Sequence, residues 1–211
     1  MNHRTILKIF RRALPAVLVA AAAVPAFAGP PLICSRFDIG TASSLPWNVG
    51  PNWRGDVDTY DRSRLTSDTL ALLTETTPVL VRMETLRRAA IYAMTDRPAA
   101  DALLNALLAR ARKAAAADGR ADGLSLFDAG YLAESYKQAD AISPGIASLV
   151  SAIDGRAMVE RSLALRGGDP AVAFAASLMT GGPAHANHLK TAQEGAKGDL
   201  LLAKNLAQAN H

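Results

Sequence analysis

The sequence predicts an all-α protein in which antiparallel helix pairs follow an irregular N-terminal arm. From about residue 62 onward, apolar residues recur at the spacing of one helix face. Short turns rich in Gly, Pro and Asp separate the apolar runs, and no stretch of this region alternates as a half-buried strand does. Because connections of a few residues join antiparallel neighbours, we expect the helices to pack as hairpins.

Each expected helix is bounded by a start or turn signal. Pro78 suits the first position of a helix, and TDRP at 95–98 ends that helix and starts the next. The stretches ISPG, GGDP, TGGP and KGD separate the later helices. Between TDRP and the turn DGRADG at 118–123 we expect one helix, which carries the apolar residues of 103–111. The other expected helices lie near 65–73, 79–93, 124–136, 146–152, 155–166, 170–179, 184–195 and 199–209.

Two segments resemble parts of a tetratricopeptide (TPR) repeat. GRAMVERSLALRGGDPAV at 155–172 is similar to a second repeat helix with its turn, and LFDAGYLAES at 126–135 is similar to a first helix. In the latter, Ala129, Gly130 and Ala133 would let a neighbouring helix approach. The resemblance implies a short TPR-like solenoid of stacked helix pairs. No fixed period runs through the chain, so an irregular helical bundle stays open as the alternative.

Residues 1–28 predict a cleaved signal peptide. Basic side chains precede an apolar run at 13–27, and Ala26, Phe27 and Ala28 form the small-x-small pattern that signal peptidase recognises. The run is shorter than the roughly 20 residues of a membrane-spanning helix, so we expect no membrane anchor after cleavage. The location expected is periplasmic or secreted, with the general and twin-arginine export routes both open.

Cleavage after Ala28 would change the charge of the protein. It removes four of the 23 Lys and Arg residues and none of the 19 Asp and Glu residues, which leaves 19 of each. A chain without excess positive charge has no general field for binding nucleic acid or an anionic membrane surface. We therefore expect no nucleic-acid partner.

Residues 29–60 form an irregular arm, followed by a helical domain at 61–211. The arm contains four Pro, four Gly and both tryptophans, and it has no helical or strand period. Because Trp47 and Trp53 are costly to leave in water, we expect the aromatic side chains to dock on the helical domain. The acidic residues of GDVDTYD suggest helix capping by Asp61 rather than a calcium loop.

Cys34 is the only cysteine. A single cysteine cannot form an internal disulfide. Ile33 stands where a lipoprotein signal requires a small residue, so lipidation is not expected. We expect either a buried small residue or an intermolecular disulfide.

A further resemblance rests on GPPLIC, FDIG, SLPW and PVLVRMETLRRAAIYA. These stretches resemble uncharacterised exported bacterial helical proteins. The resemblance implies export and a helical body and gives no activity. The chain departs from the pattern at Ser35, where a histidine would be expected after the cysteine.

Few residues suggest catalysis. His185 and His188 are three residues apart and could share a helix face as metal ligands do. The chain has no G-x-S-x-G nucleophile motif, and its Gly-rich stretches are turns that follow no strand. No cofactor is expected, and a small periplasmic hydrolase or metal-binding protein that uses the two histidines is the alternative function.

Polar residues are concentrated in two of the expected helices. In the helix at 79–93, and in the helix at 124–136, Arg, Tyr and acidic side chains interrupt an otherwise apolar pattern. Such residues favour a groove that binds an extended peptide or a carboxylate terminus. The candidate partner-binding residues are Arg82, Glu84, Arg87, Asp128, Tyr131 and Glu134.

The favoured function is therefore an exported, non-enzymatic interaction or scaffold protein with an unknown protein or peptide partner. A structural role is the other interpretation of these polar residues. Glu84 would then pair with an arginine on the solvent face, and Asp128 would pair with a neighbouring helix.

Overall fold

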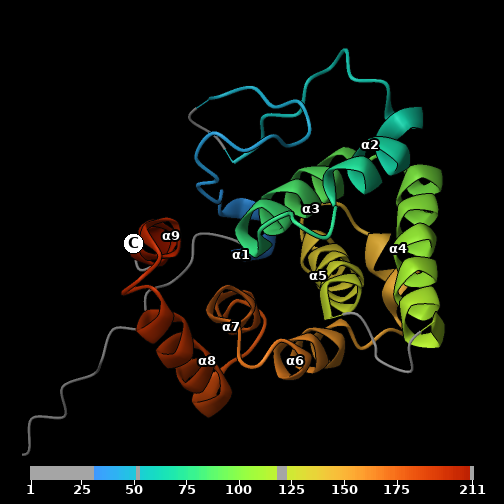
Figure 1. Ribbon diagram of the computed structural model, residues 1–211. Coiled ribbons are helices and arrows are strands. Elements are labelled where there is room, and N and C mark those ends of the chain that lie inside the picture. The colour runs from blue at the N-terminus through green and yellow to red at the C-terminus, as the bar shows by residue number, and fades with distance from the viewer. Residues whose placement is uncertain (1–30, 51–52, 118–122, 210–211) are drawn as a thin grey trace, which may run out of the picture.

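The computed structural model describes residues 31–50, 53–117 and 123–209, and Figure 1 shows their arrangement. All the regular secondary structure of these residues is helical, which confirms the all-α prediction. The expected signal peptide at 1–28 lies outside the described residues. No helix in the part of the chain that the structure describes is long and apolar enough to cross a membrane.

The helices lie close to the ranges that the turn signals predicted. One segment forms a 3₁₀ helix, η2, where an α-helix was expected near 146–152. A four-residue helix, α1, lies within the arm and was not expected, since it is too short to show a period. The elements are α1 (Pro31–Cys34), η1 (Arg62–Arg64), α2 (Leu65–Leu72), α3 (Val79–Ala93), α4 (Arg97–Ala117), α5 (Gly123–Ala139), η2 (Ile146–Val150), α6 (Gly155–Leu165), α7 (Pro170–Ser177), α8 (Gly182–Gly195) and α9 (Leu200–Ala209).

Side-chain caps explain why the helix starts were predictable. The Asp154 carboxylate accepts the Ala157 N–H at the start of α6. Asp169 does the same for two N–H groups at the start of α7, where Pro170 occupies the first turn. Asp61 caps η1 as expected, since its carboxylate accepts the Ser63 N–H. These bonds satisfy donors that a helix start leaves without a partner.

Helix α5 lies at the centre of the helical body. It packs on α1, α3, α4, α6 and η2, and Figure 1 shows it surrounded by these neighbours. The α5 side chains Phe127, Tyr131 and Tyr136 are fully buried. The helices also pack in pairs, with α5 against α6 and α7 against α8.

A glycine contact sets the distance between α5 and α6. A Cβ on Gly130 would lie 2.6 Å from the Gly155 carbonyl oxygen, and a Cβ on Gly155 would lie 2.5 Å from the Gly130 oxygen. The two backbones therefore touch, and this bears out the expectation that small residues at 129–133 admit a neighbouring helix.

The N-terminal arm is docked on the helical body, as expected from its aromatic residues. Leu32, Ile33 and Phe37 lie in the core. Trp47 packs edge-on against Tyr92 of α3, with ring centroids 6.2 Å apart, and Trp53 is half-buried against the same core.

Cys34 ends α1 and is half-buried, with a free thiol. Burial raises the pKa of this thiol, and the nearby Arg87 charge opposes the rise. A raised pKa lowers the thiolate fraction, so the structure gives Cys34 no activated character.

Replacing Gly130 by Ala should destabilise the protein. The added methyl group must separate two backbones that already touch, and overpacking of this kind costs about 1–3 kcal/mol. Gly198→Ala is the matched control, because nothing lies within 4 Å of its added Cβ. Urea denaturation should show a lower free energy of unfolding for Gly130→Ala alone; equal stability of the two variants would contradict the close contact.

Candidate functional site

Glu84 on α3 is the centre of a buried charge cluster. Its carboxylate accepts two hydrogen bonds from Arg87, at 2.7 and 2.9 Å, and one from Arg88 at 2.8 Å. It also accepts the backbone N–H of Phe37 in the arm at 3.1 Å. Only 1 % of Glu84 is exposed. The carboxylate is thus bound by two helix neighbours and by the arm.

The two arginines use their other donors on the arm backbone. Arg87 donates to the carbonyl oxygens of Ile33 and Trp53, at 3.0 and 3.1 Å. Arg88 donates to the Leu45 carbonyl at 2.7 Å. Both guanidinium groups also lie over the Trp47 ring, at 4.8 and 5.4 Å from its centroid.

Tyr92 continues this pattern one turn further along α3. Its hydroxyl donates to the Pro46 carbonyl at 2.6 Å and accepts the Val57 N–H at 2.9 Å. One face of α3 therefore binds the arm mainly through main-chain atoms, with Trp47 as the chief side-chain contact.

A second buried pair joins α3 to α5. Arg82 donates to the Asp128 carboxylate at 2.6 Å, and both side chains are at most 2 % exposed. Arg82 also donates to the carbonyl oxygens of Thr77, at 2.9 Å, and Thr74. The pair therefore also fixes the loop between α2 and α3.

Tyr131 and Glu134 make no hydrogen bond with these pairs. Burial, together with the Glu84 charge, raises the pKa of Tyr131 well above its usual value, and Arg87 opposes this. Glu134 binds Lys137 at 2.7 Å and accepts the Arg156 N–H at the start of α6, at 3.1 Å. Glu134 thus holds α6 against α5.

The candidate residues therefore do not line an open groove. Arg82, Glu84, Arg87, Asp128 and Tyr131 are all buried, so no partner can touch them while the arm is docked. The structural interpretation is confirmed in its pairings, because Glu84 binds arginine and Asp128 binds a neighbouring helix. It is corrected in one respect, since Glu84 lies inside the protein rather than on a solvent face.

The electrostatics of Glu84 follow from its partners. Burial alone would raise the pKa of this carboxyl group, because it disfavours the charged form. The hydrogen bonds and charges of Arg87 and Arg88 outweigh that effect and hold the pKa of Glu84 below its usual value. The cluster is therefore ionised at neutral pH.

His185 and His188 bind different partners. His185 Nδ1 lies 2.9 Å from the Ser177 carbonyl oxygen, and His188 Nε2 lies 2.7 Å from the Glu160 carboxylate. Within the residues that the structure describes, no three His, Cys, Asp or Glu side chains come together to hold a metal ion. The two histidines instead connect α8 to α7 and to α6.

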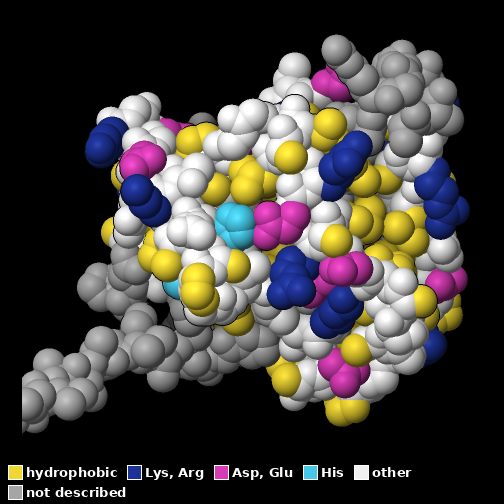
Figure 2. Space-filling view, turned by 90° about the horizontal axis from the view of Figure 1, so that it is seen from below, with side chains coloured by type: hydrophobic (Ala, Val, Ile, Leu, Met, Phe, Trp, Pro, Cys, Tyr) yellow, Lys and Arg dark blue, Asp and Glu magenta, His cyan; other side chains and the backbone are white. Residues whose placement is uncertain are grey.

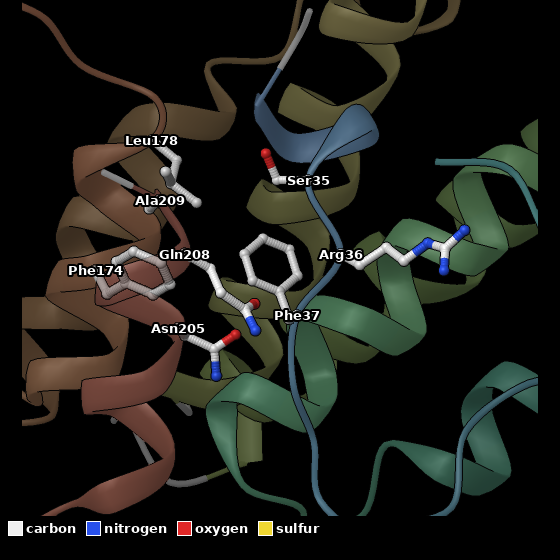
Figure 3. A pocket seen from close by; sticks show the side chains of 8 residues that line it. All are labelled: Ser35, Arg36, Phe37, Phe174, Leu178, Asn205, Gln208 and Ala209. Atoms are coloured by element: carbon white, nitrogen blue, oxygen red, sulfur yellow. The ribbon is translucent and has the colours of Figure 1, made fainter. Parts of the chain in front are cut away.

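A hollow of about 270 Å³ opens where the arm, α7 and α9 meet (Figure 3). The rings of Phe37 and Phe174 meet edge to face at 6.1 Å, which gives the hollow an aromatic border. Its lining residues are Ser35, Arg36, Phe37, Phe174, Leu178, Asn205, Gln208 and Ala209. The sequence contained no signal for this site, because its walls come from three separate parts of the chain.

The polar groups of the hollow fall into two kinds. Asn205 is fully engaged, since it accepts the Asp38 N–H at 2.8 Å and donates to the Asp38 and Leu201 carbonyls at 2.9 Å. The Ser35 hydroxyl and the Gln208 amide make no side-chain hydrogen bond with the described part of the chain. In Figure 3 both lie at the hollow.

The described lining of the hollow carries no charge that points into it. Arg36 is the only charged residue among these lining residues. The Arg36 side chain extends away from the hollow in Figure 3, and its guanidinium donates to the Arg54 carbonyl at 3.4 Å. An occupant would therefore meet apolar walls and neutral polar groups.

The described surface elsewhere is mixed in character. On the face in Figure 2, acidic and basic side chains are interspersed with hydrophobic ones, and no patch of one sign dominates the atoms that are coloured. An apolar stripe on α9 includes Leu200, which is 84 % exposed, but a single helix forms it.

No protein-family model matches the chain, and searches of the curated proteins and of the solved structures found no match.

Acidification should weaken the protein through Glu84. Its pKa is lowered in the folded state and returns to about 4.5 on unfolding, so ionised Glu84 stabilises the fold above that pH. This contribution is lost as the pH falls through the lower, folded pKa. Glu84→Gln should therefore cost roughly 3–5 kcal/mol at neutral pH, by leaving buried arginines underpaired, and should reduce the loss of stability in acid.

Urea denaturation at neutral and acid pH measures both effects. The exposed Glu75→Gln is the matched control, and its stability should follow that of the parent protein. An unchanged acid dependence in Glu84→Gln would show that folding does not lower the pKa of Glu84.

Proposed function

We propose that this protein is an exported, non-enzymatic interaction protein that binds a protein or peptide partner at the junction of the arm, α7 and α9. The observation that carries the proposal is the hollow itself. It combines apolar walls with two neutral polar side chains, Ser35 and Gln208, that make no side-chain hydrogen bond with the described part of the chain, and this is the usual character of a binding pocket.

The position of the hollow supports the same proposal. Its Phe37 wall is fixed from behind, because the Phe37 N–H binds Glu84, and its α9 wall is fixed by the Asn205–Asp38 bonds. A surface that is held in place on both sides needs little reordering on binding, so less free energy is lost.

For the architecture we propose the irregular bundle rather than a TPR-like solenoid. In a solenoid each repeat contacts only its neighbours. Here α5 packs on α1, α3, α4, α6 and η2, and α7 also contacts α3. This central packing favours a closed bundle, with binding at its edge rather than along a concave surface.

We further propose export to the periplasm, as in the exported proteins that the GPPLIC and SLPW stretches resemble. The basic start, the apolar run and the small-x-small pattern at 26–28 support it. N-terminal sequencing of the protein from its source cells should give Gly29 as the first residue. A chain that starts at Met1, or at a lipidated Cys34, would contradict this prediction.

Site-directed photo-crosslinking tests the binding surface. A photoreactive phenylalanine analogue that replaces the exposed Gln208 should give a discrete crosslinked product with a partner. The matched control is the same replacement of Ala109, which is exposed on α4 at the far side of the protein (Figure 1). It should give no such product.

Mass spectrometry of the crosslinked product identifies the partner and the attached segment. Absence of a product at Gln208, or the same product at both positions, would contradict binding at this junction.

A further inference from the structure

The hollow between the arm, α7 and α9 is too small for a whole ligand of ordinary size. Pockets that hold complete small molecules span about 300–1,000 Å³, whereas this one measures about 270 Å³. A volume at this lower limit suits one side chain of a larger ligand that continues outside.

The lining determines the chemistry of that side chain. Phe37, Phe174, Leu178 and Ala209 contribute apolar atoms, and the one charged neighbour, Arg36, is engaged elsewhere. A charged side chain would lose its hydration in the hollow without gaining a partner of opposite charge, which is costly. An uncharged apolar side chain has no charge whose hydration could be lost, and its binding would remove apolar surface from water.

The Ser35 and Gln208 side chains determine which groups of the ligand can bind beside its apolar side chain. The Gln208 amide offers both donors and an acceptor, and the Ser35 hydroxyl offers one donor and acceptor sites. A peptide unit carries one N–H and one C=O. The hollow therefore presents complementary groups beside an apolar cavity, as surfaces that bind extended peptides do.

We infer that the hollow binds one large, uncharged apolar residue of a peptide segment, with its side chain between Phe37 and Leu178 and its main chain on Gln208. This inference rests on the proposed function, because it names the ligand class of the same site. The segment is an internal one, since Arg36, the one charged side chain among the described lining residues, extends away from the hollow (Figure 3) and does not point at a terminal carboxylate there.

Capped amino-acid amides provide probes of defined chemistry. NMR titration of the purified protein with N-acetyl-phenylalaninamide should shift resonances of the lining residues. N-acetyl-alaninamide, which lacks the large side chain, should bind at least about tenfold more weakly, and so should the capped amides of lysine and glutamate. Equal binding of the charged or the small amides would overturn the inference.

Two pairs of variants locate the binding. Ala209→Phe fills the hollow and should weaken the phenylalanine probe at least about tenfold, whereas Ala207→Phe, exposed on the same helix, should leave binding unchanged. Gln208→Ala should weaken it roughly three- to tenfold, the loss expected for one or two neutral hydrogen bonds. Gln193→Ala, exposed on α8, is its matched control.

The outcomes separate this inference from the proposed function. Crosslinking at Gln208 without binding of the phenylalanine probe would reject the ligand class and leave the interaction surface standing. Failure of both experiments would reject both. Because Gln208 is exposed, its variant keeps the inference testable even if Ala209→Phe does not fold.

Discussion

The buried cluster around Glu84 needs hydrogen-bond acceptors from outside α3, and much of this structure depends on that need. A carboxylate and two guanidinium groups share one face of α3, and each guanidinium has five N–H donors. Glu84 cannot accept them all, and most carbonyls of α3 are already bound within the helix. The arm supplies the carbonyl oxygens of Ile33, Leu45 and Trp53. Loss of one partner from a buried ion pair costs about 3–5 kcal/mol, so arm and helical body fold together.

The hydrogen bonding between α3 and the arm also positions the residues of the candidate site. The arm segment that Glu84 holds through the Phe37 N–H continues at once to Asp38, which binds Asn205 of α9. Helix α9 has few contacts with other helices, of which α8 is the main one, so the arm is an important support for its position. The hollow therefore exists because α3 fixes the arm and the arm fixes α9. A change on α3 should reach the binding surface through the backbone of two arm residues.

The sequence predicted the helices well because their limits depend on local chemistry. Asp154, Asp169 and Pro170 act within a turn of their own positions. Burial of Glu84 and Arg87 could not be predicted in this way, since the backbone groups that complete their hydrogen bonding lie in an arm without periodicity. Charged residues in a helical pattern normally indicate a solvent face. The hollow could not be predicted from the sequence either, because Ser35, Phe174 and Gln208 meet only in the folded chain.

Arg and Tyr side chains concentrated on one helix indicate a binding surface. The structure shows which segment occupies that surface on α3. Helix α3 binds an irregular segment by its main-chain atoms and packs two arginines on the Trp47 ring, as a groove that binds a peptide does. The occupant is the chain's own arm. Displacing it would expose Leu32 and Ile33, which are fully buried, and would leave the Glu84 cluster short of acceptors. Both costs oppose exchange of the arm with another peptide, so the face of α3 that the sequence suggested as a binding surface stays covered by the arm.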